Sequence, residues 1–148
     1  MQPWFHDGRV SKIYLALVRG VAPQSCVVDH PIPNKPGGPR VDAVTELRRI
    51  ATVERYSIVE ARPRSGRLHQ VRRHLKHLSL PVIGDTTYGK SEHNRLLAER
   101  FGLERLALHA WELSLDHPRT AERLTIRADL PPDLAEPVRR MSLLPAAG

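Results

Sequence analysis

The chain has 148 residues, 41% of them hydrophobic and 5% aromatic, which fits a single domain with an aliphatic core. No apolar run approaches the roughly 18 residues that cross a bilayer, and the N-terminal stretch MQPWFHDGRV lacks the basic-then-apolar pattern of a signal peptide. The sequence therefore predicts no membrane partner. Its single cysteine, Cys26, indicates a reducing compartment and so the cytoplasm.

The charge is more informative than the rest of the composition. Lys and Arg number 23 against 16 Asp and Glu, a net charge of +7 with neutral histidines. Such a charge suits a polyanionic partner bound through its phosphates. It is equally compatible with a basic surface that only keeps the protein in solution, so composition indicates a partner class and no chemistry.

The N-terminal half reads as strands around a loop. Residues 12–18, KIYLALV, are a continuous apolar run rich in β formers, typical of a strand buried on both faces. Residues 31–40 hold four prolines and two glycines, which predicts a surface loop. Two further strands are expected at about 42–50 and 53–62, with Ala51 and Thr52 as the turn of a hairpin.

Two helices follow. Residues 67–78 are predicted to be helical because Leu68, Val71, Leu75 and Leu78 form one apolar stripe. Residues 91–101 are predicted as a second helix, with Ser91 as N-cap and Gly102 as its stop.

The C-terminal part is expected to return to strands. Residues 104–116 alternate apolar and polar side chains, with an irregularity near Trp111. A short strand at 123–127, a helix near 132–141 and a loose tail at 142–148 complete the expected elements. The predicted class is α+β, one domain over residues 1–148 with a largely antiparallel, mixed sheet and a few helices.

The densest chemistry lies in residues 66–89. On a helix, His69, Arg72 and Lys76 form a basic stripe beside the apolar one. Arg72 is nearest the border between the two, a position that suits an arginine holding a carboxylate in bidentate geometry. The alternative is an ordinary amphipathic helix with a solvated basic face.

The three histidines of this segment do not predict a metal site. His69 and His74 point in directions about 140° apart on a helix, and no Cys or carboxylate completes a ligand set with His74 and His77. Asp85, which follows Gly84, is interpreted as a turn or capping carboxylate rather than a catalytic one.

The same segment carries a family resemblance. GRLHQVRRHLKHLSLPVIGDTTYG resembles the G-R-x-H-Q-x-R-x-H…P-x-x-G-D-x-x-Y-G signature of the RluA family of RNA pseudouridine synthases. KIYLALVRG resembles the K-x-Y-x-A-x-V-x-G strand of that family, and RLALHAWELSLDHP its L-x-L-H-A-x-x-L-x-x-x-H-P segment. The three occur in the family's order, and HNRLLAERFGLERLALHA is most similar to the TruC-like tRNA branch.

The resemblance implies roles for individual residues. Tyr14 would lie against a uracil flipped out of its stack, and Arg72 would pair with the nucleophilic aspartate. The RNA-binding residues it implies, together with the basic surface, are Arg67, His69, Gln70, Arg73 and Lys76, the first three either ordering the turn before the helix or touching RNA. Leu106 and Leu108 would line the pocket. The family uses no metal or organic cofactor, and its substrate is RNA, with tRNA favoured here over rRNA.

One family motif is absent from the sequence as given. The nucleophilic aspartate of the family lies in an H-R-L-D-x-x-T-S-G motif before the K-x-Y strand, and the eleven residues before Lys12 do not resemble it. Asp7 is the only carboxylate there. We therefore expect a truncated synthase that is inactive alone. The alternatives are a non-catalytic RNA-binding remnant and one half of a split enzyme.

Overall fold

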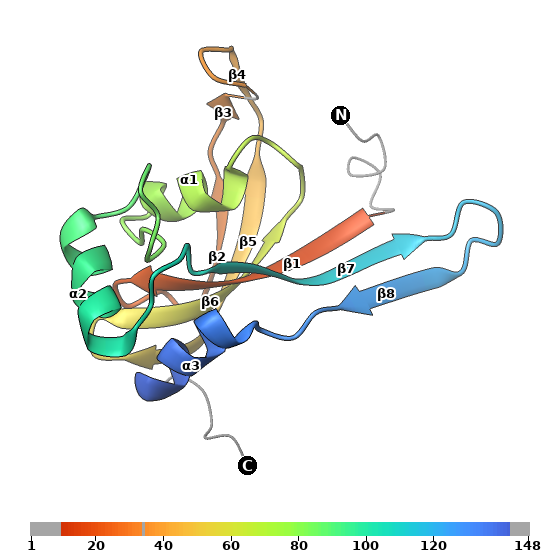
Figure 1. Ribbon diagram of the computed structural model, residues 1–148. Coiled ribbons are helices and arrows are strands. Elements are labelled where there is room, and N and C mark those ends of the chain that lie inside the picture. Colours follow the sequence, from red (N-terminus) through yellow and green to blue (C-terminus); the bar gives the residue numbers. More distant parts are fainter. Residues whose placement is uncertain (1–9, 34, 143–148) are drawn as a thin grey trace.

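A six-stranded antiparallel sheet forms the centre of the protein (Figure 1). The structure, a computed structural model, describes residues 10–33 and 35–142. The strands lie in the order β2-β5-β6-β1-β7-β8, with bounds Ser25–Asp29, Val44–Val53, Tyr56–Pro63, Val10–Arg19, Leu108–Asp116 and Arg123–Arg127. The helices are α1 (Gln70–His77), α2 (Ser91–Phe101) and α3 (Pro132–Arg140). The predicted α+β class with a largely antiparallel sheet is confirmed.

Strand β1 is covered on both faces of the sheet. Side chains alternate between the faces of a strand, so Tyr14 faces the side of α1, while Leu15 and Leu17 line an apolar hollow under α3. Figure 1 shows α1 above the sheet and α3 below it. This double cover explains why the run of residues 12–18 is continuously apolar instead of alternating.

The strands β5 and β6 form the expected hairpin, but the position of its turn was wrong. The turn is made by Glu54 and Arg55, whereas Ala51 and Thr52 belong to β5. A bulge in β5 between Arg49 and Ala51 lengthens this strand, and Glu54 adopts a positive φ of 53°. Hydrogen bonding along the ladder therefore outweighs the weak local turn signal.

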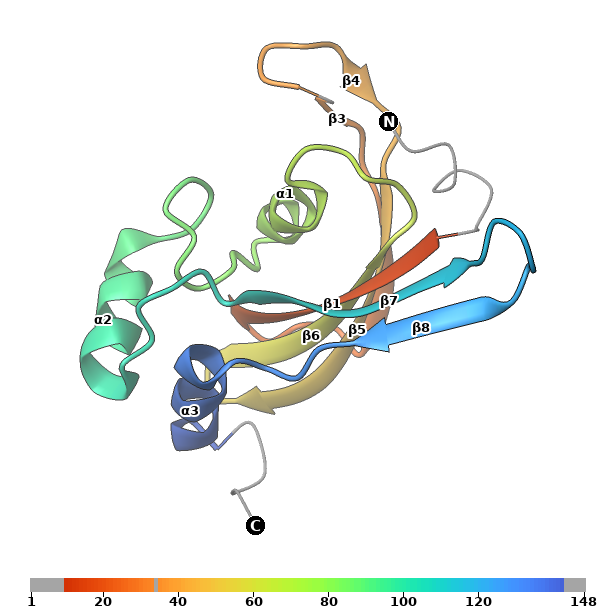
Figure 2. The same cartoon turned by 45° about the vertical axis from the view of Figure 1, so that its right-hand side comes forward.

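The proline-rich segment is not all loop. Residues Ile32–Pro33 (β3) and Arg40–Val41 (β4) pair as a short antiparallel ribbon. Ile32 anchors this ribbon because its side chain is buried. The ribbon stands beside α1 at the top of Figures 1 and 2.

The helices agree with the sequence to different degrees. The bounds of α2 match the prediction, and Gly102 ends this helix with a φ of 75°. Its N-cap is Lys90 and not Ser91, and no side chain caps it. Helix α1 begins at Gln70, three residues later than predicted, because His69 has left-handed backbone angles (φ 52°, ψ 33°). Within the described residues, no helix is long and apolar enough to cross a membrane.

Strand β7 starts at Leu108 and contains the predicted irregularity. Ile13 pairs with Glu112 and Tyr14 with Ala110, so Trp111 is the extra residue of a β-bulge. Beyond the bulge, β7 and β8 extend as a ribbon past the body of the protein (Figure 2). The predicted strand 123–127 is β8, and the predicted helix 132–141 is α3. Of the predicted loose tail, residues 143–148 lie outside the described part of the chain.

The loop between α1 and α2 is fastened to the end of β1. Backbone hydrogen bonds join Arg19 to Pro81 and Ile83 to Leu17, at 3.0 and 2.9 Å. Gly84 has a φ of 81°, and a Cβ on it would lie 2.0 Å from the carbonyl oxygen of Arg105. Only glycine fits so close to the Arg105 backbone, and this turn places the next residue, Asp85, beneath α1.

Candidate active site

A cavity of about 320 Å³ opens between β1, the loop before α1, α1 itself and the segment leading into β7. Its lining joins the three sequence motifs, which lie far apart along the chain. It is lined by Lys12, Tyr14, Pro63, Ser65, Gly66, Arg67, His69, Gln70, Val71, Arg72, Leu106 and Leu108. We call this cavity the Tyr14 pocket. No Asp or Glu is among the described residues that line it.

Arg72 holds a carboxylate in bidentate geometry, and the carboxylate is Asp85. Nε of Arg72 donates to Oδ2 of Asp85 and Nη2 donates to Oδ1, both at 2.8 Å. The Asp85 side chain is fully buried, and that of Arg72 is 17% exposed. The backbone amides of Thr87 and Tyr88 also donate to Oδ1 of Asp85, each at 3.0 Å. Asp85 thus closes a turn, as interpreted from the sequence, and also orients the arginine.

The electrostatics of the pair favour two charged groups. Burial by itself would raise the pKa of Asp85, but the hydrogen bonds from Arg72, Tyr88 and Thr87 outweigh burial and bring this pKa below its usual 3.8. The hydrogen bond to Asp85 raises the pKa of Arg72. One edge of the guanidinium is therefore occupied, while Nη1 makes no hydrogen bond to any described residue. That nitrogen remains able to bind a second anion.

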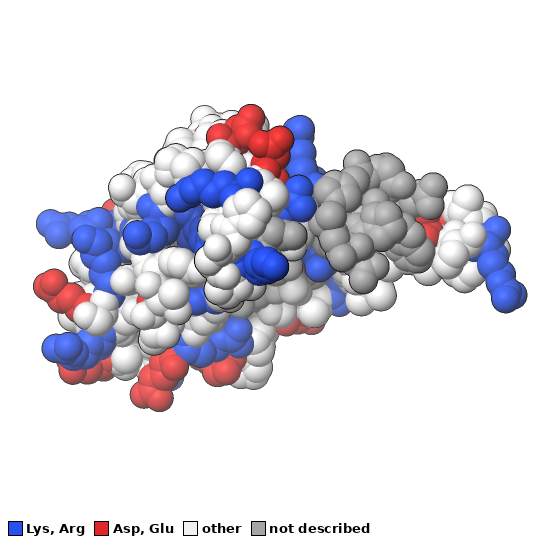
Figure 3. Space-filling view, turned by 90° about the horizontal axis from the view of Figure 1, so that it is seen from above, with Lys and Arg blue, Asp and Glu red and all other residues white. Residues whose placement is uncertain are grey.

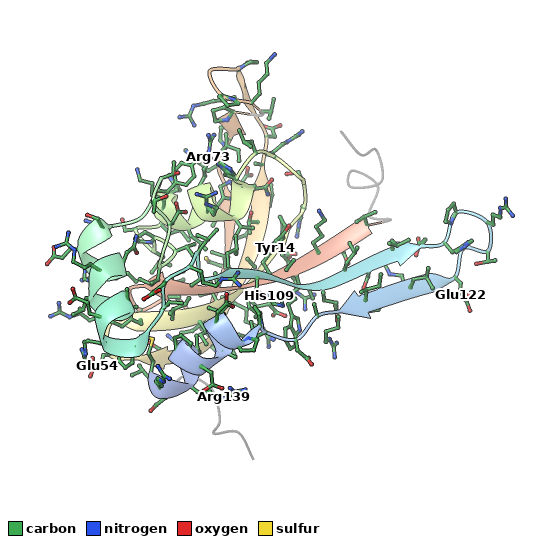
Figure 4. The ribbon with its side chains drawn as sticks, viewed as in Figure 1. Tyr14, Glu54, Arg73, His109, Glu122 and Arg139 are labelled. Atoms are coloured by element: carbon green, nitrogen blue, oxygen red, sulfur yellow. The ribbon has the colours of Figure 1, made fainter. Side chains whose placement is uncertain are left out.

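Tyr14 supplies an aromatic wall from the middle of β1 (Figure 4). Burial raises the pKa of its phenol above 10.0, so the side chain is neutral at physiological pH. A neutral phenol can donate a hydrogen bond while its ring packs against a planar base. Leu106 and Leu108 add apolar walls. The pocket therefore combines a flat apolar surface with a fixed cation, an arrangement suited to a nucleobase.

Gln70 fastens the loop before α1 to the sheet. Its Oε1 accepts hydrogen bonds from Ser65 Oγ and the Arg67 amide, and its Nε2 donates to the Val44 carbonyl and to Thr45 Oγ1. The side chain is buried, and both ends of its amide are engaged. Of the two roles considered for Gln70, ordering the turn is the one that these contacts support.

Tyr88 connects the pocket to the outer side of α1. Its hydroxyl accepts a hydrogen bond from Nε of Arg73 at 2.8 Å and lies 3.0 Å from Nδ1 of His69. The Arg72 guanidinium carbon lies 5.1 Å from the centre of the Tyr88 ring, within the range of a cation–π contact. Burial and the charges of Arg72 and Arg73 lower the pKa of His69 below 6.5. His69 is therefore neutral at pH 7.

The structure separates the basic residues that the sequence grouped together. Arg67, His69 and Arg72 line the Tyr14 pocket, whereas Arg73 and Lys76 line a different hollow, between α1 and the β3–β4 ribbon. The site residues that sequence reasoning did not select include Lys12, Ser65 and Tyr88. Lys12 and Tyr88 belong to the quoted motifs, which was the available signal, but Ser65 carries no motif signal at all.

The histidines of α1 occupy three separate environments. His74 is fully buried between Thr45 Oγ1 and the His30 carbonyl, at 2.7 and 2.8 Å, and His77 stacks on the His30 ring. His69 bonds to Tyr88 instead. Within residues 10–33 and 35–142, no three His, Cys, Asp or Glu side chains are placed to hold a metal ion.

Comparison with known sequences gives one consistent result. The sequence model of a family described as RNA pseudouridylate synthase matches residues 1–77. The tRNA pseudouridine synthase C of Vibrio cholerae is 39% identical over 151 residues, covering 88% of this chain and 62% of the relative. That of Haemophilus ducreyi is 40% identical over 148 residues, covering 86% of this chain and 61% of the relative. The chain thus spans about three fifths of the length of these relatives.

Solved structures agree with the sequence comparison. Human RNA Pseudouridylate Synthase Domain Containing 4 superposes with a TM-score of 0.77 at 26% identity, covering 95% of this chain and 66% of that protein. Human RNA Pseudouridylate Synthase Domain Containing 1 superposes with a TM-score of 0.71 at 24% identity, covering 98% and 71%. The second likeness concerns the fold alone.

Proposed function

The chain belongs to the RNA pseudouridylate synthase family, and from this membership we propose that the Tyr14 pocket receives a uridine of RNA for isomerisation to pseudouridine. In that reaction the bond between the ribose and N1 of uracil breaks, the base rotates, and a bond from the ribose to C5 replaces it. C5 loses its proton and N1 gains one. The observation that carries the proposal is the convergence of Tyr14 and Arg72 on one cavity.

The described side chains have distinct parts in this proposal. The neutral phenol of Tyr14 would pack against the extruded uracil and assist proton transfer at C5. Arg72, oriented by Asp85, would present its remaining nitrogen to the nucleophilic carboxylate that the family resemblance implies. Extruding a base costs a few kcal/mol, which contacts from the basic surface to phosphates would offset.

The nucleophile is the missing part of this proposal. Asp85 is an unsuitable candidate because its four accepted hydrogen bonds hold it beneath Arg72, and no described carboxylate lines the pocket. We infer that the described residues bind RNA without isomerising it and that chemistry requires a carboxylate from an H-R-L-D motif. RNA binding without catalysis is accordingly the second candidate function of the chain by itself.

We propose tRNA as the RNA, because the relatives with the matching sequence are called tRNA pseudouridine synthase C. The single cysteine supports a cytoplasmic, reducing environment for this activity.

The experiment is tritium release from tRNA labelled at C5 of uridine. The chain alone should release none, whereas the same chain joined to the H-R-L-D segment of a relative should release tritium. In the joined protein, Tyr14→Phe should lower turnover by at least about 100-fold, a typical loss when a group assisting proton transfer is removed. Arg72→Lys should also lower turnover strongly, because lysine cannot hold the nucleophilic carboxylate and Asp85 in bidentate geometry. Arg64→Lys alters an exposed ion pair with Glu46 and is the matched control.

Two outcomes would contradict these assignments. Release of tritium by the chain alone would refute the need for an added carboxylate. Full turnover in the Arg72→Lys variant would refute the role of the fixed guanidinium, because lysine cannot make the bidentate contact.

A further inference from the structure

The side chain of Asn94, on α2, holds the turn that carries Asp85. Oδ1 of Asn94 accepts a hydrogen bond from the Gly84 amide at 2.7 Å, and Nδ2 of Asn94 donates to the Asp85 carbonyl at 3.2 Å. The φ and ψ angles of Gly84 and Asp85 lie between these two bonded groups. The side-chain amide therefore fixes the stretch of backbone from which the Asp85 carboxylate projects.

The two backbone groups require a donor and an acceptor on one short side chain. The Gly84 N–H donates and the Asp85 carbonyl accepts, so an asparagine amide satisfies both. An aspartate at position 94 would place an acceptor oxygen against the Asp85 carbonyl, and an alanine would satisfy neither group. The partners also determine the orientation of the Asn94 amide, because a flipped amide would oppose donor to donor and acceptor to acceptor.

The same turn packs against the segment that leads into β7. A Cβ on Gly84 would lie 2.0 Å from the carbonyl oxygen of Arg105 and 3.0 Å from the Cα of Leu106. Leu106 lines the Tyr14 pocket. Asn94 thus holds the Asp85 turn in contact with a wall of the pocket.

The inner face of α2 places Asn94 at this turn. Leu97, about one helical turn further along, is fully buried. Nε2 of His93 accepts a hydrogen bond from Nε of Arg19 at 3.0 Å, and its Nδ1 lies 3.4 Å from the Tyr56 hydroxyl. At the left end of Figure 3, where α2 lies, Lys, Arg, Asp and Glu side chains gather at the surface. The charged side of α2 therefore faces solvent, and His93, Asn94 and Leu97 face the protein.

The carboxylate that Asn94 positions is the one that orients Arg72. Oδ2 and Oδ1 of Asp85 accept hydrogen bonds from Nε and Nη2 of Arg72, both at 2.8 Å. Asp85 belongs to the loop between α1 and α2, so no helix or strand of its own fixes its place. The direction of the guanidinium depends on where this loop holds the carboxylate. A displacement of about 1 Å in a reacting group can cost about 100-fold in rate.

From these contacts we propose that Asn94 is a positioning residue of the active site, which holds the Gly84–Asp85 backbone so that the Asp85 carboxylate keeps Arg72 directed into the Tyr14 pocket. The inference rests on the proposed function for its effect on turnover. Its effect on Arg72 rests on the described contacts alone. Helix α2, which contributes no described residue to the lining of the pocket, thereby gains a part in the reaction.

The first test follows the Nε–H of Arg72 by nuclear magnetic resonance in the 148-residue chain. This proton points at the buried Asp85 carboxylate, so it should exchange slowly with water. Its signal is identified by its loss in Arg72→Lys, which has no guanidinium. Asn94→Ala should speed the exchange by about tenfold or more, since two hydrogen bonds to the turn are lost.

His93→Ala is the matched control. It removes polar contacts of α2 with Arg19 and Tyr56 and leaves the Gly84–Asp85 turn untouched, so the Arg72 proton should exchange as in the wild type. Thermal melts of all variants check the fold.

Asn94→Asp separates the turn from the stability of the helix. It keeps the acceptor for the Gly84 amide and adds a negative charge near the N-terminus of α2, where the helix dipole favours it. It loses only the donor to the Asp85 carbonyl. Exchange of the Arg72 proton should again be faster than in the wild type.

The second test is tritium release from C5-labelled tRNA by the joined protein. Asn94→Ala should lower kcat about tenfold and keep KM within about twofold, because the direction of Arg72 matters more in the reaction than in binding. His93→Ala should leave kcat unchanged.

The outcomes separate this inference from the proposed function. Wild-type exchange of the Arg72 proton in both Asn94 variants would overturn it. Equally fast exchange in Asn94→Ala and His93→Ala would also overturn it, because a general loosening of α2 would then explain the effect. Faster exchange with unchanged kcat would overturn the part of Asn94 in the reaction. Faster exchange confined to the Asn94 variants, in a joined wild-type protein that releases no tritium, would support the positioning of Arg72 and refute the proposed function.

Discussion

Replacing Asp85 with asparagine should destabilise the fold more than any other single removal of a charge from an ion pair in the described structure. The carboxylate accepts four hydrogen bonds, two from Arg72 and one each from the amides of Thr87 and Tyr88. Asparagine retains one acceptor oxygen for the turn amides. Its amide nitrogen would then face Nε of Arg72, so two donors would oppose each other.

The magnitude follows from burial. Removing one partner of a buried pair typically costs about 3–5 kcal/mol. The Arg72 side chain is 17% exposed, and water can partly solvate it once Asp85 is neutral. We therefore expect the lower end, a loss of about 3 kcal/mol in the free energy of unfolding. With a urea slope of about 2 kcal/mol/M for a protein of this size, the midpoint should fall by about 1.5 M.

Urea denaturation followed by tryptophan fluorescence measures this loss. The matched control is Asp133→Asn, because Asp133 pairs with Arg105 at the surface, where the two side chains are 65% and 33% exposed. An exposed pair contributes about 0–1 kcal/mol, so the control should leave the midpoint nearly unchanged. Similar shifts for both variants would refute the reasoning that burial makes the Arg72–Asp85 pair important.

Acid provides an independent check on the same pair. The pKa of Asp85 in the folded protein lies below its usual 3.8, so the unfolded chain binds a proton more readily than the folded one. The stabilisation from Asp85 is thus fully present above about pH 4 and is lost as pH falls through the folded pKa. The difference in stability between wild type and Asp85→Asn should accordingly shrink in strong acid.

Two further predictions concern stability. Gly84→Ala should lower the melting temperature by at least about 12 °C, because its Cβ would lie 2.0 Å from the Arg105 carbonyl oxygen. Gly37→Ala, also at positive φ but with open space around it, should cost only backbone strain of about 1 kcal/mol, or about 4 °C. Comparable shifts for the two variants would contradict the steric argument. Burial lowers the pKa of His74 below 6.5, so the unfolded chain takes up a proton that the folded protein does not, and stability should fall as pH drops below about 6.5. Thermal melts between about pH 5 and 8 should therefore show a weaker pH dependence for His74→Gln than for the wild type. An unchanged pH dependence in the variant would exclude His74 as its source.

Elements with strong local signals were predicted well from the sequence. Helix α2 ends at Gly102 because a left-handed residue is needed there. Strand β8 has the predicted bounds, and the phase change in the alternating pattern located the bulge at Trp111. These features depend on neighbours within a few residues, which is the range that periodicity and capping rules describe.

Elements decided by distant contacts were placed less well. Helix α1 begins at Gln70 and not at residue 67, because His69 has left-handed backbone angles. The Gln70 side chain fastens this start of the helix to Val44 and Thr45 of β5, which are distant in sequence. Periodicity along the helix carries no information about those partners. The β5–β6 turn was misplaced for the same reason, since pairing across the ladder, including its bulge, determines where the strands end.

The sequence by itself determined the α+β fold class, the basic charge and the family motifs, and it indicated that Arg72 binds a carboxylate. Only the tertiary structure decided that the described carboxylate on Arg72 is Asp85, and that Arg73 and Lys76 face a groove separate from the pocket. The reason is geometric. Residues adjacent on α1 point to different sides of the helix, and what each side meets depends on β1, the α1–α2 loop and the β3–β4 ribbon.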